Sequence, residues 1–353
     1  MIDAFAYEGL PIRVRFGRNT VADLAEEVRR LGVKRALVIT TPGRAAQGGQ
    51  IGSLLGEAFA GVFSNAVMHT PTDVTERALE MLRASGADGV IAVGGGSTTG
   101  LGKALALRTG VKQLCIPTTY AGSEMTPILG ETKGGVKATV RTLDVLPETV
   151  IYDVNMTLTL PPQISVTSGV NAIAHAVEAL YAKDRNPVVS LMAVECVRAF
   201  GRALPVIVRD TQNIEARSDA LYGAWLGGAC LGLVGMALHH KLCHVLGGSF
   251  DLPHAETHTV VLPHAMAYNA AAAPDAMDEL AAALGVRDAA KGLFDLIGKL
   301  GAPRSLREIG MTQSAIDQAA DLAVQSADWN PRPLERHAIR DLIARAWAGE
   351  API

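Results

Sequence analysis

The stretch GVIAVGGGSTTGLGKALAL, residues 89–107, joins a short apolar run to a helix-compatible run through Gly94, Gly95, Gly96 and Ser97. Glycines at such a junction remove side chains where backbone N–H groups must approach a ligand, and the start of the following helix favours a phosphate. Tight turns between strands and helices also use glycine without any ligand. The stretch therefore predicts a strand, a turn and a helix, with a pyrophosphate as the candidate ligand of the turn.

Apolar runs of the same kind recur on both sides of this stretch and are separated by helical patterns. The strand-like runs are RALVIT at 35–40, VFSNAVM at 62–68, LCIPTT at 114–119 and TVIYD at 149–153, and a helical pattern covers 73–84. Short β-branched runs that alternate with helices are typical of a parallel sheet with helices on both faces. The N-terminal half is therefore expected to be an α/β domain.

A second loop, PTTYAGSE at 117–124, also follows a strand-like run and offers the hydroxyls of Thr118 and Thr119. Two such loops at the carboxyl ends of parallel strands predict a ligand crevice. The run at 35–40 is followed by Thr41, whereas an NAD-selective site usually places Asp or Glu there against the ribose hydroxyls. Residues 1–155 are thus expected to bind NADH or NADPH.

The pattern changes after residue 155, because the strand-like runs disappear and apolar residues fall at helical spacing. The helical patterns cover 163–181, 187–204, 213–235 and 236–248, and VVLPH at 260–264 is too short to predict a sheet. Pro161 and Pro162 interrupt both kinds of pattern. Residues 156–353 are therefore expected to form an all-α domain that follows the α/β domain.

Four polar residues in this second half form a candidate site. Asn171 and His175 stand four apart in an Ala-rich run and would share one helix face, and His240 and His254 could approach them from two further segments. Histidines in this pattern are typical of a metal pocket, but Asn171 offers only a neutral amide oxygen. The pocket has either lost its metal or holds one through three imidazoles.

The composition excludes several classes of partner. The chain has 353 residues, 49% of them hydrophobic and 19% charged, with a net charge of −3, which predicts a well-packed protein without a nucleic-acid footprint. It has no apolar run of the roughly 18 residues that a membrane span needs. Its four cysteines are scattered without a CxxC pair. We therefore expect a cytoplasmic protein that binds neither nucleic acid nor membrane.

Six motifs together resemble the iron-containing alcohol dehydrogenase family in the same order along the chain. They are GGGS at 94–97, PTT at 117–119, SGVNAIAHAVEA at 168–179, HHKLCHVLGG at 239–248, PHA at 253–255 and LPHAMAYN at 262–269. The resemblance implies a Rossmann-like N-terminal domain, an all-helical C-terminal domain with the dehydroquinate synthase-like fold, and a homodimer.

The resemblance also assigns residues to roles. Metal-dependent members carry an Asp and three His, which match Asn171, His175, His240 and His254, and a family lysine near the cofactor ribose matches Lys137. Gly100 stands where metal-dependent relatives carry an acid after the glycine turn, and the threonine loop is one residue shorter than usual. Together with NPRPL at 330–334, these departures resemble a branch that reduces the carbon–carbon double bond of maleylacetate to give 3-oxoadipate in aromatic degradation.

Such a reaction would use the histidines without a metal. A hydride from NADH or NADPH would generate an enolate, which imidazoles can stabilise and protonate. The catalytic candidates are Asn171, His175, His240, His244 and His254. The cofactor candidates are Gly94, Gly95, Gly96, Ser97, Thr118, Thr119, Lys137 and Thr41. The candidates for the dicarboxylate substrate are Tyr120, Ser123, Lys241 and Arg332.

Two other interpretations remain open. A metal-dependent alcohol dehydrogenase would use Fe²⁺ or Zn²⁺ on the three histidines to polarise an alkoxide. A catalytically silent nucleotide-binding protein would have no physical need for imidazoles in an apolar helix. His239, His258 and His264 are expected to pack around the site, and Cys243 is expected to be a small buried apolar residue.

Overall fold

The computed structural model describes residues 4–134, 136–326 and 329–353 and divides the chain into two compact units. The first unit is Gly9–Leu160, and the second is Pro161–Ile353 together with the N-terminal segment that ends at Glu8. The first unit includes the 3-10 helix Val154–Thr157 and ends at Leu160, directly before Pro161 and Pro162, which interrupt the sequence pattern.

The first unit is built on a six-stranded parallel sheet. In the order in which they lie side by side, the strands are β1 Arg13–Gly17, β8 Thr149–Asp153, β5 Lys112–Pro117, β4 Gly89–Gly94, β2 Ala36–Ile39 and β3 Phe59–Phe63. The predicted strands at 35–40, 114–119 and 149–153 are confirmed as β2, β5 and β8. The strand predicted near 62–68 exists as β3 but lies earlier in the chain, because its pairing with β2 begins with Phe59 opposite Ala36.

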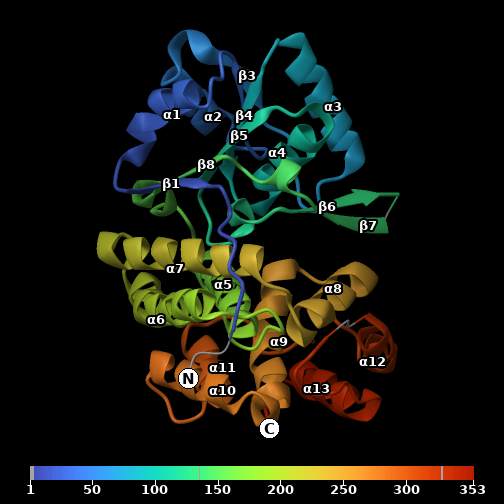
Figure 1. Cartoon of the computed structure of the whole chain (residues 1–353). Helices are drawn as coiled ribbons and strands as arrows, with labels where there is room; N and C mark the ends of the chain where they lie inside the picture. The colour runs from blue at the N-terminus through green and yellow to red at the C-terminus, as the bar shows by residue number, and fades with distance from the viewer. Residues whose placement is uncertain (1–3, 135, 327–328) are drawn as a thin grey trace. The chain divides into compact units, whose positions relative to one another are not determined.

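Helices cover both faces of this sheet, as Figure 1 shows for α1 and α2 on one side and α3 and α4 on the other. Their bounds are α1 Leu24–Arg30, α2 Ala45–Ser53, α3 Thr72–Ala84 and α4 Gly96–Thr109. Side chains of a strand alternate between the faces, so Val38 packs with the α1 and α2 side, whereas Leu37 and Ile39 pack with α3 and α4. An antiparallel hairpin, β6 Ile128–Lys133 and β7 Val136–Arg141, follows β5.

Helices are the only regular secondary structure of the second unit among the residues described, 4–8, 161–326 and 329–353. Its helices are α5 Pro162–Leu180, α6 Pro187–Arg209, α7 Ile214–Leu233, α8 Leu238–Phe250, α9 His254–Asn269, α10 Pro274–Leu284, α11 Ala289–Lys299, α12 Ala315–Ser326 and α13 Arg336–Ala348. The four predicted helical stretches are confirmed as α5 to α8, and VVLPH lies within α9.

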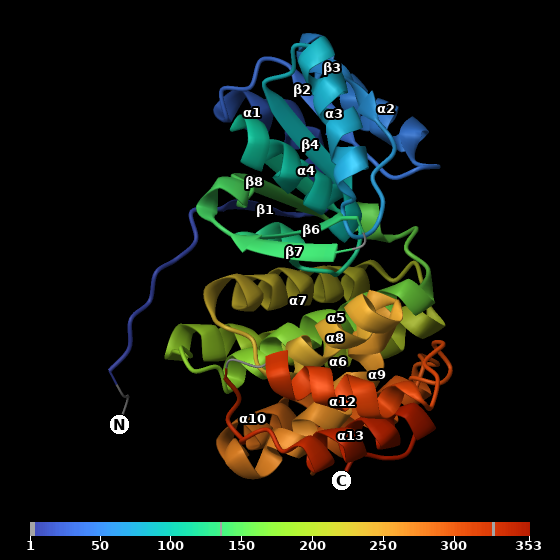
Figure 2. The same cartoon turned by 90° about the vertical axis from the view of Figure 1, so that its right-hand side faces the viewer.

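Two groups of helices make up the core of the second unit. Helices α5, α6 and α7 pack on one another, and α12 lies beside α13 (Figure 2). A second core joins α8, α9, α12 and α13 through residues such as Leu242, Val261, Ala319 and Ile343. Over the described part of the chain no single helix is long and apolar enough to cross a membrane; α7 and α8 pass that test only as a pair bent by 95°.

Candidate active site

Three loops of the first unit meet at the carboxyl edge of the parallel sheet. Strands β2, β4 and β5 are neighbours, and Gly94 at the end of β4 is paired with Pro117 at the end of β5. The N–H of Thr118 donates to the Gly94 carbonyl at 2.9 Å, which joins the glycine turn to the threonine loop. The structure thus brings together two predicted loops and the segment after β2 that carries Thr41. Crevices at this edge are where open α/β sheets bind ligands.

Glycine occupies each of the three positions of the turn for a different physical reason. Gly94 has a φ of 151°, and a Cβ there would lie 2.7 Å from Thr98 Oγ1. A Cβ at Gly95 would lie 2.8 Å from Thr119 Oγ1, so this glycine permits the close approach of the two loops. A Cβ at Gly96 would meet nothing within 4 Å, so only a ligand at the α4 N-terminus would require glycine there.

Gly100, which replaces an acid of metal-dependent relatives, lies in a packed position. It is buried in α4, and a Cβ there would collide with Thr70 Oγ1. Thr70 is itself held in the left-handed region, with a φ of 45°. Packing in this chain therefore leaves no room for an Asp side chain at Gly100 without a shift of Thr70.

A buried lysine that the sequence analysis missed supports the threonine loop. Lys103 Nζ on α4 donates to the carbonyls of Ser123, Thr126 and Ile128 at 2.7–2.8 Å and to Thr126 Oγ1 at 2.9 Å. Burial lowers the pKa of Lys103 to about 7, although Cys115 and Glu124 oppose this. A lysine inside the apolar run GLGKALAL was the available signal, because lysine is rarely buried without partners.

The remaining loop candidates differ in accessibility. Ser97, Thr118, Thr119, Thr41 and Ser123 are half-buried. Tyr120 is completely buried, so a substrate could contact its side chain only if the loop moved. Lys137 lies in β7, and its side chain is outside the part of the chain that is described.

The second unit brings the predicted polar residues together on three helices. Asn171 and His175 lie on α5, His240 on α8 and His254 at the start of α9. The rings of His175 and His240 stack with centroids 5.2 Å apart, and His258 lies 5.0 Å from His240 and 4.3 Å from His254. His258, expected to pack around the site, therefore links two of its predicted members.

Several polar atoms of this cluster are buried without a hydrogen-bond partner among the described residues. They are Asn171 Oδ1, His175 Nδ1, His240 Nε2 and His258 Nε2. A buried polar atom left unpaired costs about 1–3 kcal/mol, so proteins rarely retain such atoms without a ligand. Four in one cluster indicate a binding site for a polar molecule or ion.

Burial also sets the charge of the imidazoles. Burial, with His240 and His254 nearby, holds the pKa of His175 well below its usual range. The pKa values of His239 and His258 are lowered for the same reason. His175, His239 and His258 are therefore neutral at neutral pH and can each donate one hydrogen bond and accept another.

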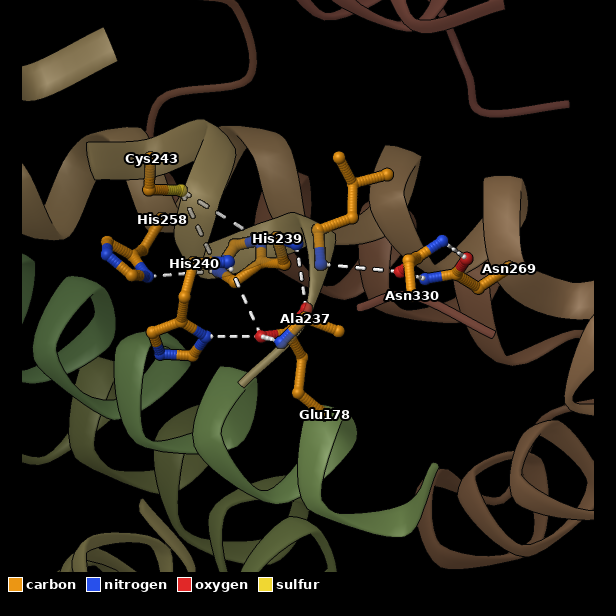
Figure 3. Close-up of polar contacts among 9 residues, drawn as sticks. Glu178, Ala237, His239, His240, Cys243, His258, Asn269 and Asn330 are labelled. Atoms are coloured by element: carbon orange, nitrogen blue, oxygen red, sulfur yellow. Dashed lines mark hydrogen bonds and ion pairs between the residues drawn. The ribbon is translucent and has the colours of Figure 1, made fainter. Parts of the chain in front are cut away.

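Glu178 is a further member of the cluster, and the sequence analysis did not identify it. It lies on α5 three residues after His175, is completely buried, and its Oε2 lies 2.7 Å from His240 Nδ1 (Figure 3). The signal was a carboxylate in the apolar run AHAVEAL, since Glu is rarely buried unless it is paired.

Other candidates lie at the margin of the cluster. His244 is exposed, with its ring 6.5 Å from that of His240, and Lys241 is half-buried. Arg332 lies with its guanidinium 4.2 Å above the Tyr268 ring and donates to the Tyr268 carbonyl at 3.2 Å. His264 lies elsewhere, 6.0 Å from the Phe294 ring. The cation at Arg332 thus already has a packing role in this unit.

The sequence of each unit matches one family. Residues 11–154 match iron-containing alcohol dehydrogenase, and residues 165–347 match the C-terminal part of the Fe-containing alcohol dehydrogenase family. The chain belongs to the iron-containing alcohol dehydrogenase family. The predicted fold class, an α/β domain followed by an all-α domain, is confirmed.

The relatives narrow this class to one kind of enzyme. The chain is 56% identical to maleylacetate reductase of Rhizobium sp. (strain MTP-10005) over 99% of both chains, and 53% identical to maleylacetate reductase 1 of Rhodococcus opacus over 99% of this chain and 98% of that one. The crystal structure of maleylacetate reductase from Agrobacterium tumefaciens aligns with a TM-score of 0.96 at 56% identity, covering 99% of this chain and 100% of that one.

The family name implies iron, and the donor atoms of the cluster fit it poorly. The four matching positions supply one neutral amide and three imidazoles, whereas non-haem Fe(II) sites usually combine imidazoles with a carboxylate. A second group, His239, Cys243 and His258, has donor atoms within 4.8 Å of one another. There, however, His239 Nε2 and His258 Nδ1 are 2.9 Å apart, a hydrogen-bond distance, and burial raises the pKa of the Cys243 thiol well above its usual range.

Proposed function

We propose that this protein reduces the carbon–carbon double bond of maleylacetate to give 3-oxoadipate, with NADH or NADPH as the hydride donor and without a metal, in the degradation of aromatic compounds. The observation that carries the proposal is the 56% identity, over 99% of both chains, to a maleylacetate reductase. The family consists of NAD(P)-dependent oxidoreductases, and Asn171 in place of a ligand carboxylate supports the metal-free reaction.

The proposed reaction balances with one hydride and one proton. The hydride adds to the alkene carbon that is β to the ketone, and the C=C electrons move to form an enolate. A protonated imidazole then gives its proton to the α carbon, which restores the ketone and yields 3-oxoadipate and NAD(P)⁺. The neutral imidazole regains a proton from solvent. Donors in a buried site stabilise the enolate oxygen more strongly than water does.

The first unit is proposed to bind the cofactor. The glycine turn and the α4 N-terminus would receive the pyrophosphate, for which Gly96 leaves the backbone N–H groups open. Thr118 and Thr119 on the adjoining loop, and Lys137 on β7, would contact the rest of the cofactor. Thr41 after β2 offers no carboxylate to repel a 2′-phosphate, so we expect comparable use of NADH and NADPH.

The histidine cluster of the second unit is proposed to bind the substrate. His175, His240 and His254, with Asn171, would bind the ketone and the developing enolate, and His244 at the margin is a further candidate donor. Ser123, Tyr120, Lys241 and Arg332 remain candidates for the two carboxylates. Of these, Lys241 and Ser123 are half-buried, whereas Tyr120 is completely buried and Arg332 is stacked on Tyr268.

The assembly and location of the protein are also proposals. We propose a cytoplasmic homodimer, which the family resemblance supports, and we expect no nucleic-acid or membrane partner. The net charge of −3 supports the first of these exclusions.

A substrate comparison tests the proposed function. Initial rates of NADH oxidation should be measured with maleylacetate and, separately, with simple aldehydes at the same concentrations. We expect turnover of maleylacetate and rates near background with aldehydes. Efficient aldehyde reduction with no turnover of maleylacetate would instead indicate an alcohol dehydrogenase.

A further inference from the structure

The carboxylate of Glu178 accepts hydrogen bonds from the first turn of α8. Its Oε1 accepts from the His239 N–H at 2.7 Å, and its Oε2 accepts from the N–H of Ala237 at 2.9 Å and of His240 at 3.4 Å (Figure 3). Ala237, the N-cap residue of α8, has no side chain that could do this. A carboxylate from α5 thus takes the place of the missing cap.

The same carboxylate decides which ring nitrogen of His240 carries hydrogen. His240 Nδ1 lies 2.7 Å from Oε2, an oxygen that already accepts from the Ala237 N–H. A carboxylate oxygen in this position can only accept, so Nδ1 must donate. When one nitrogen of a neutral imidazole is a donor, the other is an acceptor. His240 Nε2, which is buried and has no partner among the described residues, is therefore the nitrogen left for a ligand.

A second contact fixes the same helical turn from the C-terminal segment. Asn330, the first residue of NPRPL, accepts from the Leu238 N–H at 3.3 Å. Its amide is paired with that of Asn269 through two hydrogen bonds, at 2.7 and 3.1 Å, and also donates to the Arg332 carbonyl at 2.7 Å. Four successive N–H groups, from Ala237 to His240, are thus held by two side chains from elsewhere in the chain.

We propose that Glu178 is a positioning residue for the reaction: it holds the first turn of α8 and keeps hydrogen on His240 Nδ1, so that Nε2 is the ring nitrogen that faces the substrate and donates to it when the ring is protonated. The identity of the substrate in this inference rests on the proposed function. The tautomer of His240 does not, because it follows from the hydrogen bonds alone.

The tautomer can be measured directly on the unaltered full-length protein. In histidine labelled with ¹⁵N, the chemical shifts of the two ring nitrogens distinguish a protonated nitrogen from an unprotonated one. His240→Gln serves only to assign the signals, which should disappear in that variant. We expect His240, in its neutral form, to be protonated at Nδ1 and not at Nε2. A signal from Nε2–H would overturn the proposal.

A pair of variants tests the consequence for turnover. Glu178→Gln keeps the shape of the side chain but turns one acceptor into a donor that must face a backbone or imidazole N–H. We expect kcat with maleylacetate to fall about 10–100-fold, as is usual when a group that orients a functional histidine is changed. The KM for NADH should stay within about twofold, since Glu178 does not belong to the unit proposed to bind the cofactor.

The matched control is Asn186→Ala, which removes another buried side-chain cap of a helix in the same unit. Asn186 Oδ1 accepts from the Val189 N–H at 3.1 Å and caps α6, a helix that carries none of the histidines of the cluster. Both variants should unfold at lower urea concentration, but only Glu178→Gln should lose kcat.

The possible results distinguish failure of the positioning role of Glu178 from failure of the proposed function. Unchanged kcat in Glu178→Gln, or an equal loss in Asn186→Ala, would overturn the positioning role. If the unaltered protein carried the Nδ1–H tautomer but did not turn over maleylacetate, the inferred geometry would be supported and the proposed function would fail.

Discussion

The rings of His175 and His240 stack at an angle of 29°, with their centroids 5.2 Å apart, although they come from different helices. Two buried imidazoles this close cannot both carry a positive charge at low cost, because like charges in a low dielectric repel strongly. Burial and His240 together hold the pKa of His175 well below its usual range. At neutral pH, His175 is therefore a neutral hydrogen-bonding partner, and at most one of the pair can act as a cation toward an enolate.

Asn171→Asp should create a metal site in this cluster. The variant would add a carboxylate to three imidazoles, which is a far better donor set for Fe²⁺ or Zn²⁺. We expect affinity for either ion to rise at least about tenfold. Isothermal titration, with metal analysis of both purified proteins, measures it.

The control is Asn213→Asp, which places the same charge at the N-cap of α7, where Asn213 Oδ1 accepts from the Ala216 N–H. It should leave metal affinity unchanged. Tight binding of a metal by the unaltered protein would contradict the metal-free account.

Gly96→Ala should weaken cofactor binding without harming the fold. A Cβ there meets no protein atom within 4 Å and φ is not positive, so the unfolding free energy should be unchanged or higher by up to about 1 kcal/mol. The methyl group would occupy the approach of a pyrophosphate to the α4 N-terminus. We expect the NADH dissociation constant, from fluorescence titration, to rise at least about tenfold, or 1.4 kcal/mol.

Gly49→Ala in α2 is the matched control, since a Cβ there is equally unobstructed. It should leave NADH affinity unchanged. Equal affinities in both variants would show that the pyrophosphate does not lie at the glycine turn.

Lys103→Met should loosen the threonine loop. The substitution keeps the length of the side chain but removes every hydrogen bond from Nζ to the Ser123–Ile128 segment. We expect the unfolding free energy to fall by about 2–4 kcal/mol, because buried carbonyls lose their donor, and NADH binding to weaken. Lys112→Met, at the exposed start of β5, removes only an ion pair with Glu148, so it should lower the unfolding free energy by at most about 1 kcal/mol and leave NADH binding unchanged. If Lys103→Met matched it, the loop would not depend on Lys103.

The free energy of unfolding should decrease as the pH is lowered, because His264 is buried in its neutral form. Burial, with Arg345 as a second cause, lowers the pKa of His264 from 6.5 to about 4. In the unfolded chain His264 is therefore protonated below about pH 6.5, whereas in the folded protein it is protonated only below about pH 4. The contribution to stability is complete above pH 6.5 and is lost as the pH falls toward 4, by at most about 3 kcal/mol.

Urea unfolding at pH 7.5 and at pH 4.5 measures this loss. In His264→Leu, the difference between the two conditions should shrink by about 2–3 kcal/mol, and in His337→Leu, an exposed position on α13, it should not change. A difference that is the same in all three proteins would remove His264 as the cause.

The sequence predicted the elements whose pattern is local. Strands β2, β5 and β8 are apolar and buried on both faces, and α5 to α8 have clear helical spacing, so each was identified from its own residues. Strand β1 escaped notice because Arg13 and Arg15 interrupt its apolar pattern at a sheet edge. The position of β3 depends on its pairing with β2, which cannot be read from the residues of the segment alone.

The sequence predicted which residues form the site but not the hydrogen bonds that hold them in place. Spacing placed Asn171 and His175 on one helix face, and motif order added His240 and His254. The roles of Glu178, Lys103 and Asn330 depend on contacts between segments 20 to 92 residues apart, so they required the tertiary structure.

The most direct test of the central claim is the initial rate of NADH oxidation with maleylacetate, measured on protein dialysed against a strong chelator and assayed in metal-free buffer. Full activity, unchanged by added Fe²⁺ or Zn²⁺, is the result that we predict for a reductase that works through its histidines alone. Activity that vanished on dialysis and returned with either metal would contradict the account and assign the cluster to metal-dependent chemistry.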